Sequence, residues 1–179
     1  IHLDDAKDKM DLTKTITTYD RGYNYTELMI KIIKLNSYFI IRAKTSVFKK
    51  QQSQMEKTQT NDETFDINLN AAKINKFYNE DLKKYAEKMR EFKLRIVKVK
   101  LKNGKSETLF TNLPNKIATP EELKQLYGDR WKIETNYDRL KNKLHIEKFT
   151  GKKKIIIEQD FYSHIYLFNV LIALKNDAE

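Results

Sequence analysis

The sequence predicts a mixed α/β fold in which a strand–helix–strand unit and two long helices enclose a mainly β insertion. Three observations predict this fold class: a β-prone run and amphipathic stretch near the start, an Asn-Gly hairpin signal, and helical periodicity in the last third. Of the 179 residues, 40% are hydrophobic and only 4 are Gly and 2 are Pro. Most of the chain can therefore form regular structure around a core.

A strand, a helix and a second strand are predicted within residues 1–45. The β-prone run at residues 16–19 stops at Asp20-Arg21-Gly22, after which Thr26 can cap an amphipathic helix. Residues 38–41 are apolar throughout, which favours an interior strand with both faces buried. Asp20 is therefore expected at the carboxyl end of the first strand, the edge where ligand sites of α/β sheets lie.

Residues 46–110 are predicted to be the mainly β insertion. Residues 49–63 are polar, which favours an exposed loop or ribbon. A half-buried strand and a charged helix over residues 79–92 follow, and two strands joined by Asn103-Gly104 close the segment. Basic residues along this hairpin could follow DNA or simply face solvent: Lys93, Arg95, Lys98, Lys100 and Lys102.

A long helix is predicted from Pro120 to about residue 144. It opens with Thr119-Pro120-Glu121-Glu122, which supplies a hydroxyl cap, a proline at the first position and two acids in the first turn. On a helical wheel an arc of roughly 60° holds four polar side chains, those of Tyr127, Arg130, Glu134 and Lys141. An apolar stripe for core packing lies beside this arc.

The polar arc has two interpretations. It is either a solvated face, with Arg130 and Glu134 as an ordinary i,i+4 ion pair, or a functional row. The residue types alone favour the first interpretation. What supports the second is that all four residues fit one combined signature, Tyr-x2-Arg-x3-Glu-x6-Lys. Trp131 lies on the other flank of the arc.

Charge and composition restrict the partners. With 35 Lys+Arg against 25 Asp+Glu, the net charge of +10 favours an anionic partner, nucleic acid before membrane. Residues 155–174 form the longest apolar region, but polar interruptions predict a buried helix and no membrane span. The absence of Cys excludes disulfides and thiolate metal sites.

Several segments together resemble the bacterial insertion-sequence transposases with a DDE catalytic triad. The Tyr-x2-Arg-x3-Glu-x6-Lys spacing is the signature of one large branch of that family. Tyr-Asp-Arg-Gly-Tyr at residues 19–23 resembles the context of the second catalytic aspartate. Residues 39–44 are similar to the strand that follows it, and residues 111–113 to the strand that re-enters the core before the glutamate helix.

This resemblance implies a retroviral-integrase (RNase H-like) core, with residues 1–45 and 111–179 forming part of it. It implies that the carboxylates of Asp20 and Glu134 are catalytic and bind metal, with two Mg²⁺ or Mn²⁺ ions in the complete site. Three residues would contact phosphates at the transposon end: Tyr127, Arg130 and Lys141. Trp131 would lie near the DNA-end pocket, although an indole is more often a core residue.

The same resemblance implies the partners and the location. The partners would be double-stranded DNA, from transposon ends and target, and a second copy of the protein in an active homodimer. The location would be the bacterial cytoplasm, at the nucleoid.

The sequence departs from the family at the first aspartate of the triad. Only 19 residues precede Asp20, too few for three strands and a helix, and four acidic residues there are expected to be loop charges: Asp4, Asp5, Asp8 and Asp11. With Ile1 as the first residue, this predicts the C-terminal half of a catalytic domain, inactive alone and prone to associate. The alternatives are a non-catalytic DNA-binding or assembly remnant of a transposase and a nuclease of the same superfamily.

Overall fold

The computed structural model describes residues 12–101, 104–143 and 145–177. The chain divides into two units, Ile1–Tyr127 and Gly128–Glu179. Some residues with sequence-based predictions lie outside the described residues, namely Asp4, Asp5, Asp8, Asp11, Lys102 and Asn103.

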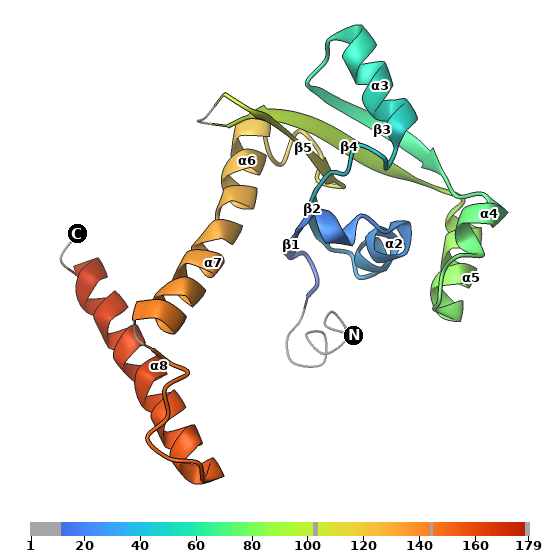
Figure 1. Cartoon of the computed structure of the whole chain (residues 1–179). Helices are drawn as coiled ribbons and strands as arrows, with labels where there is room; N and C mark the ends of the chain where they lie inside the picture. The colour runs from blue at the N-terminus through green and yellow to red at the C-terminus, as the bar shows by residue number, and fades with distance from the viewer. Residues whose placement is uncertain (1–11, 102–103, 144, 178–179) are drawn as a thin grey trace. The chain divides into compact units, whose positions relative to one another are not determined.

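The first unit is built on one five-stranded sheet with the order β1-β2-β5-β4-β3 (Figure 1). The strands are β1 (Ile16–Tyr19), β2 (Tyr38–Arg42), β3 (Asp62–Asn68), β4 (Glu91–Lys100) and β5 (Ser106–Thr111). β1 and β2 are parallel, and every other pair is antiparallel. The predicted mixed α/β fold is thereby confirmed, and β2 is the interior strand that its apolar run predicted.

The alternation of side chains along the strands divides the core into two faces. In β2, Phe39 and Ile41 belong to one buried cluster and Ile40 to the other. The helices that contribute to the first face are α2 (Thr26–Lys34), α3 (Lys49–Thr58), α4 (Ala71–Ile74) and α5 (Glu80–Met89). Of these, α2 contacts both β2 and α5 (Figure 1). On the second face α6 (Pro120–Gly128) buries Leu123 and Tyr127.

The prediction of a loop or ribbon at residues 49–63 was wrong, because α3 (Lys49–Thr58) occupies most of it. Lys, Gln, Met and Glu all have good helix propensity, so the segment needs few apolar anchors. Met55 is fully buried, and the side-chain amide of Gln52, also buried, donates to the backbone oxygens of Lys44 (2.9 Å) and Val47 (2.6 Å). One buried apolar side chain and one buried amide are enough to anchor α3. The polar composition of the segment therefore did not indicate a helix.

Other predictions for the insertion are confirmed. The strand around Ile67 is β3, and the charged helix is α5, which starts where the side chain of Asn79 accepts from the backbone N–H of Leu82 (3.0 Å). β4 and β5 form the predicted hairpin, with Gly104 at φ +78°, a left-handed value that suits glycine. Arg95 is an exception within the basic hairpin residues, because it is buried.

The seam between β2 and β5 explains the segment at residues 111–113. The hydroxyl of Thr111 donates to the backbone oxygen of Phe39 (2.5 Å), and the Asn112 amide accepts from Phe39 N–H (2.9 Å) and donates to Ser37 O (2.9 Å). Side chains therefore extend the ladder beyond the last backbone pair. They hold the chain beside β2 just before it turns toward α6.

The second unit is helical, with α7 (Arg130–Asp138), the π-helix η2 (Arg139–Lys143) and α8 (Lys154–Asp177). The predicted long helix is thus present, but it is interrupted at Asp129, directly after Gly128, and its last part widens to π-helical geometry. Within the second unit, the π-helical part changes the angular position that an uninterrupted α-helix would give to Lys141 relative to Arg130.

α8 forms over the predicted residues but is not the buried helix that was expected. Large apolar side chains along it are exposed: Ile155, Phe161, Tyr162, Tyr166, Leu167, Leu171 and Leu174. These residues surround the helix axis instead of forming one stripe, so a single neighbouring element cannot cover them all. No helix in the described part of the chain combines the length and apolar character needed to cross a bilayer.

Candidate active site

Asp20 directly follows β1 and lies at the carboxyl end of that strand, as predicted. It is exposed and begins a short 3-10 turn, η1 (Arg21–Tyr23), in which the backbone N–H of Tyr23 donates to Asp20 O (3.0 Å). Tyr19 and Tyr23 flank it, with ring centroids 5.5 Å apart, and burial raises the pKa of Tyr19. The Tyr19–Tyr23 contact spans the turn, and Asp20 lies exposed at the end of β1.

Asn24 joins this turn to the end of β2. Its buried amide donates to the backbone oxygens of Arg21 (2.7 Å) and Arg42 (2.8 Å), and its carbonyl accepts from Lys44 N–H (3.3 Å). β1 and β2 are parallel, so their carboxyl ends meet at one edge. The residues that follow the two strands are thereby held together by a single side chain.

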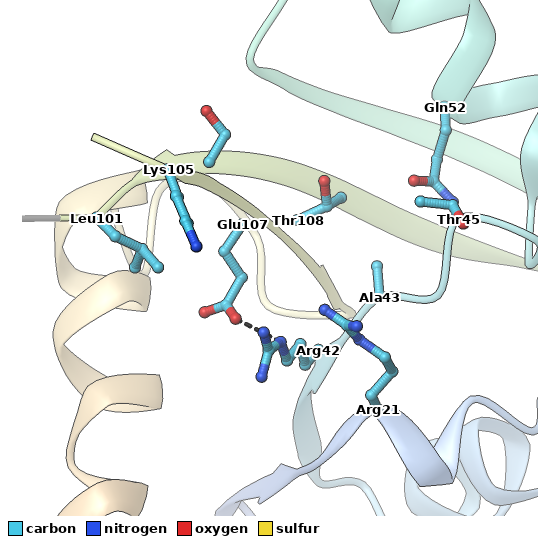
Figure 2. A pocket seen from close by; sticks show the side chains of 10 residues that line it. Arg21, Arg42, Ala43, Thr45, Gln52, Leu101, Lys105, Glu107 and Thr108 are labelled. Atoms are coloured by element: carbon cyan, nitrogen blue, oxygen red, sulfur yellow. Dashed lines mark ion pairs between the residues drawn. The ribbon is translucent and has the colours of Figure 1, made fainter. Parts of the chain in front are cut away.

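A basic pocket of about 280 Å³ lies at this edge (Figure 2). Three cationic side chains line it, Arg21 from η1, Arg42 from β2 and Lys105 from the β4–β5 hairpin. Glu107 of β5 also lines it and forms an ion pair with Arg42 at 2.5 Å between Oε1 and Nε. No local sequence pattern marks Arg42, Lys105 or Glu107, because only the fold brings the hairpin to the end of β2.

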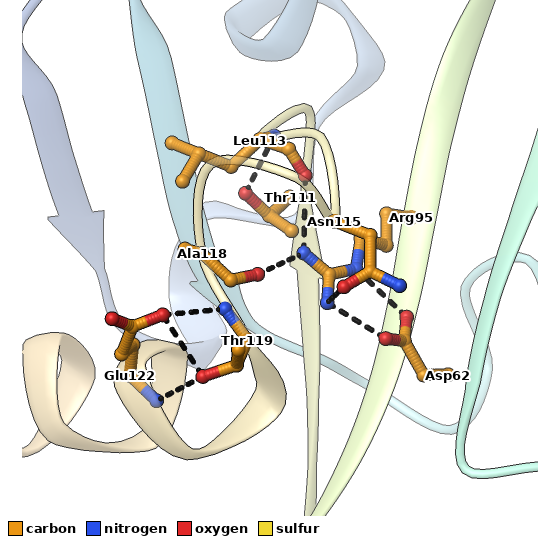
Figure 3. Close-up of polar contacts among 8 residues, drawn as sticks. All are labelled: Asp62, Arg95, Thr111, Leu113, Asn115, Ala118, Thr119 and Glu122. Atoms are coloured by element: carbon orange, nitrogen blue, oxygen red, sulfur yellow. Dashed lines mark hydrogen bonds and ion pairs between the residues drawn. The ribbon is translucent and has the colours of Figure 1, made fainter.

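Arg95 ties the insertion to the segment that leads into α6 (Figure 3). Its side chain is 2% exposed and donates to both carboxylate oxygens of Asp62, each at 2.7 Å. It also donates to the backbone oxygen of Ala118 (2.6 Å). The sequence signal for this role is a charged residue within a run of apolar strand residues.

α6 starts with the predicted cap. The Thr119 hydroxyl accepts from Glu122 N–H (3.3 Å), while the Glu122 carboxylate accepts from the Thr119 N–H (2.7 Å) and hydroxyl (2.9 Å). This reciprocal arrangement is a capping box. The bonds from Thr119 hold the pKa of Glu122 below its usual value. At the other end of α6, Tyr127 is 2% exposed and belongs to the cluster that includes Ile40 and Leu123.

In the second unit, the side chains of the neighbouring residues Arg130 and Trp131 contact each other. The guanidinium carbon of Arg130 lies 5.4 Å from the Trp131 ring centroid, a cation–π contact. Trp131 is 54% exposed, so the alternative that its indole is a core residue is not what the structure shows. Lys141 is exposed and pairs with Glu147 at 3.1 Å, and that hydrogen bond raises the pKa of Lys141.

Glu134 lies in α7, one helical turn after Arg130, so its backbone is on the predicted helix. Its side chain is outside the described residues. Asp20 and Glu134 belong to different units, and their approach to one another stays a prediction. Among the residues that the structure describes, no three acidic or histidine side chains form a metal-binding group.

The sheet thus places Asp20 at the carboxyl end of a parallel strand, and Glu134 lies on a helix of the second unit. The model of the transposase DDE domain matches residues 2–170, which is most of the chain. The chain therefore belongs to the transposase DDE domain family, whose members bind DNA and generally use divalent metal ions. No curated protein matches it.

Proposed function

We propose that Asp20 and Glu134 are catalytic carboxylates of a transposase that cleaves and joins DNA ends. The observation that carries this proposal is the family match over residues 2–170, combined with the exposed position of Asp20 at the end of β1. These are two of the three carboxylates of a DDE triad. The site would work in the bacterial cytoplasm at the nucleoid, within a homodimer bound to transposon ends.

The residues fit the metal that the family uses. Carboxylate oxygens are hard ligands, which Mg²⁺ and Mn²⁺ prefer, and the chain has no Cys to favour a softer ion. Asp20 and Glu134 would help to hold such ions, which would supply activation of an attacking hydroxyl and stabilisation of the leaving oxygen of a phosphodiester. The contribution of this chain would be to position Asp20 at the sheet edge. The η1 turn and the hydrogen bonds of Asn24 support that position.

The helix residues would handle the DNA end. Arg130 can bind a phosphate through two parallel N–H groups, whereas Lys141 acts as a mobile point charge. When DNA binds, Lys141 would exchange its ion pair with Glu147 for a contact with a phosphate. Tyr127 is buried here, so its hydroxyl would reach a phosphate only after a local rearrangement of α6.

The test is Glu134→Gln in the full protein, with Glu121→Gln on the exposed first turn of α6 as the matched control. We expect Glu134→Gln to abolish Mg²⁺-dependent cleavage while DNA-end binding is retained, and Glu121→Gln to cleave normally. Asp20→Asn should lower Mn²⁺ affinity measured by electron paramagnetic resonance, whereas Asp81→Asn on α5 should not.

The outcomes separate the rival functions. Full cleavage by Glu134→Gln would overturn the assignment of the glutamate. Cleavage by the wild-type protein without strand-transfer products would indicate a nuclease of the same superfamily. DNA binding without any cleavage by the wild-type protein would indicate an assembly module.

A further inference from the structure

The basic pocket beside Asp20 is a constructed feature of the first unit. Its cations come from three separate segments, the η1 turn, the end of β2 and the β4–β5 hairpin. Buried amides fix two of its walls, since Asn24 holds Arg21 and Arg42 through their backbone oxygens and Gln52, itself a lining residue, holds the chain after β2 at Lys44. The backbone positions of Arg21 and Arg42 are thus set before any ligand arrives.

The charges in the pocket do not cancel. Its charged lining residues are three cations, Arg21, Arg42 and Lys105, and one carboxylate, that of Glu107, so these side chains sum to a formal charge of about +2. The Glu107 side chain is 10% exposed and that of Arg42 29% exposed, and solvent and salt screen a partly buried pair less than a surface pair. The charge of the lining therefore favours an anion over a cation in this pocket.

The carboxylate that pairs with Arg42 indicates the kind of anion that the pocket can bind. A carboxylate oxygen of Glu107 lies 2.5 Å from Nε of Arg42 (Figure 2). A phosphodiester presents two non-bridging oxygens that share one negative charge, as a carboxylate does. One of them can meet the planar N–H groups of Arg42 while the other meets Arg21 or Lys105.

The pocket also lies next to the proposed catalytic residue Asp20. Arg21 follows Asp20 directly in the chain, and Arg42 ends the strand that runs parallel to β1. A DNA phosphate bound in the pocket would therefore lie close to the part of the DNA that reaches Asp20 at the sheet edge.

We infer that this pocket binds a phosphodiester of the DNA backbone through Arg21, Arg42 and Lys105, and that Glu107 is an internal competitor displaced from Arg42 when DNA binds. That the anion is DNA rests on the proposed function. The pocket itself rests only on the geometry of the first unit.

The experiment measures binding of a fluorescent DNA duplex to the full chain by anisotropy across a series of NaCl concentrations. Arg21→Ala and Lys105→Ala are chosen because both residues are exposed. Each should weaken binding about tenfold, as expected when a charge-assisted hydrogen bond to phosphate is removed. The slope of log affinity against log salt should become shallower by about 0.9 for each phosphate that the variant no longer neutralises. Thermal unfolding of each variant confirms that it is folded.

Two further variants make the test specific. Lys84→Ala in α5 removes the same charge outside the pocket lining and should change the affinity by less than about twofold. Glu107→Gln should bind DNA about three- to fivefold more tightly, because it frees Arg42 from a competing ion pair.

The inference is overturned if Arg21→Ala and Lys105→Ala behave like Lys84→Ala, or if Glu107→Gln binds DNA more weakly. It is also overturned for DNA if inorganic phosphate protects the wild-type chain against thermal unfolding and the variants abolish that protection while leaving DNA affinity unchanged. The proposed function is judged separately by cleavage in Glu134→Gln, so the two can fail independently.

Discussion

The guanidinium of Arg95 and the carboxylate of Asp62 form a two-point ion pair, with Nε–Oδ1 and Nη2–Oδ2 distances of 2.7 Å each. The pair joins β4 to β3, and the remaining donors of Arg95 reach the backbone oxygens of Leu113 (3.4 Å) and Ala118 (2.6 Å). A single buried cation therefore connects the insertion to the segment that enters α6. The insertion is part of the framework that positions α6, in addition to any role it has in binding.

Asp62→Ala should lower the free energy of unfolding by about 3 kcal/mol, because it leaves the Arg95 charge buried without its carboxylate. The matched control is Asp66→Ala on the same strand, whose pair with Lys93 is exposed and 3.4 Å long. It should cost less than about 1 kcal/mol. Urea unfolding followed by circular dichroism measures both, and equal destabilisation of the two variants would contradict the role given to Arg95.

The start of α6 should be sensitive to both Thr119 and pH. Thr119→Ala removes the capping hydroxyl and should lower the free energy of unfolding by about 1 kcal/mol. The pKa of Glu122 is lower in the folded chain than in the unfolded chain. Its contribution is therefore complete above the unfolded pKa and is lost as the pH falls through the folded pKa.

The measurement for this pH effect is the stability difference between the wild-type chain and Glu122→Gln, followed from neutral pH to about pH 3. The difference should be largest near neutrality and shrink below the ordinary glutamate range. A constant difference over that range would show that the charge of Glu122 has no part in the cap. Glu121→Gln, one residue earlier on the same exposed turn, is the control.

The parts of the fold that could be predicted from sequence are those decided by neighbouring residues. β1 ends at a turn that begins with Asp20, β2 is apolar on both faces, and the Thr119 cap is a local pattern. In each case the residues that determine the element also lie inside it. Local patterns are therefore sufficient for these elements.

The parts that could not be predicted depend on contacts between distant residues. Arg95 is buried because Asp62 and Ala118, 33 and 23 residues away in the chain, supply its acceptors. The cations of the basic pocket converge only when the hairpin is placed beside β2. For the site itself, Asp20 could be placed at its strand end, whereas its approach to Glu134 depends on two units that no local pattern relates.

Asn24→Ala should disturb the sheet edge without removing any pocket charge. The variant cannot make the bonds to the backbone oxygens of Arg21 and Arg42, and the orphaned groups should cost about 1–3 kcal/mol of stability. Because the two arginines are then less well positioned, DNA affinity should fall while the salt slope stays the same. Anisotropy titrations at several salt concentrations check this, and Asn70→Ala, at the exposed cap of α4, is the control for removal of an asparagine.

Trp131 offers a direct probe of the helix that carries Glu134, because it is the single tryptophan of the chain and more than half of it is exposed. If the indole contacts DNA, a duplex should change its fluorescence, and Trp131→Ala should weaken binding about fivefold or more, as expected for loss of a stacking platform. The same substitution should change the free energy of unfolding by less than about 1 kcal/mol, since an exposed ring contributes little to the core. Tyr166→Ala on α8, an exposed aromatic of the same unit, should leave both affinity and fluorescence change intact. Unchanged Trp131 fluorescence at saturating DNA, with equal affinities for the two variants, would remove Trp131 from the DNA interface and leave Arg130 without its stacking partner there.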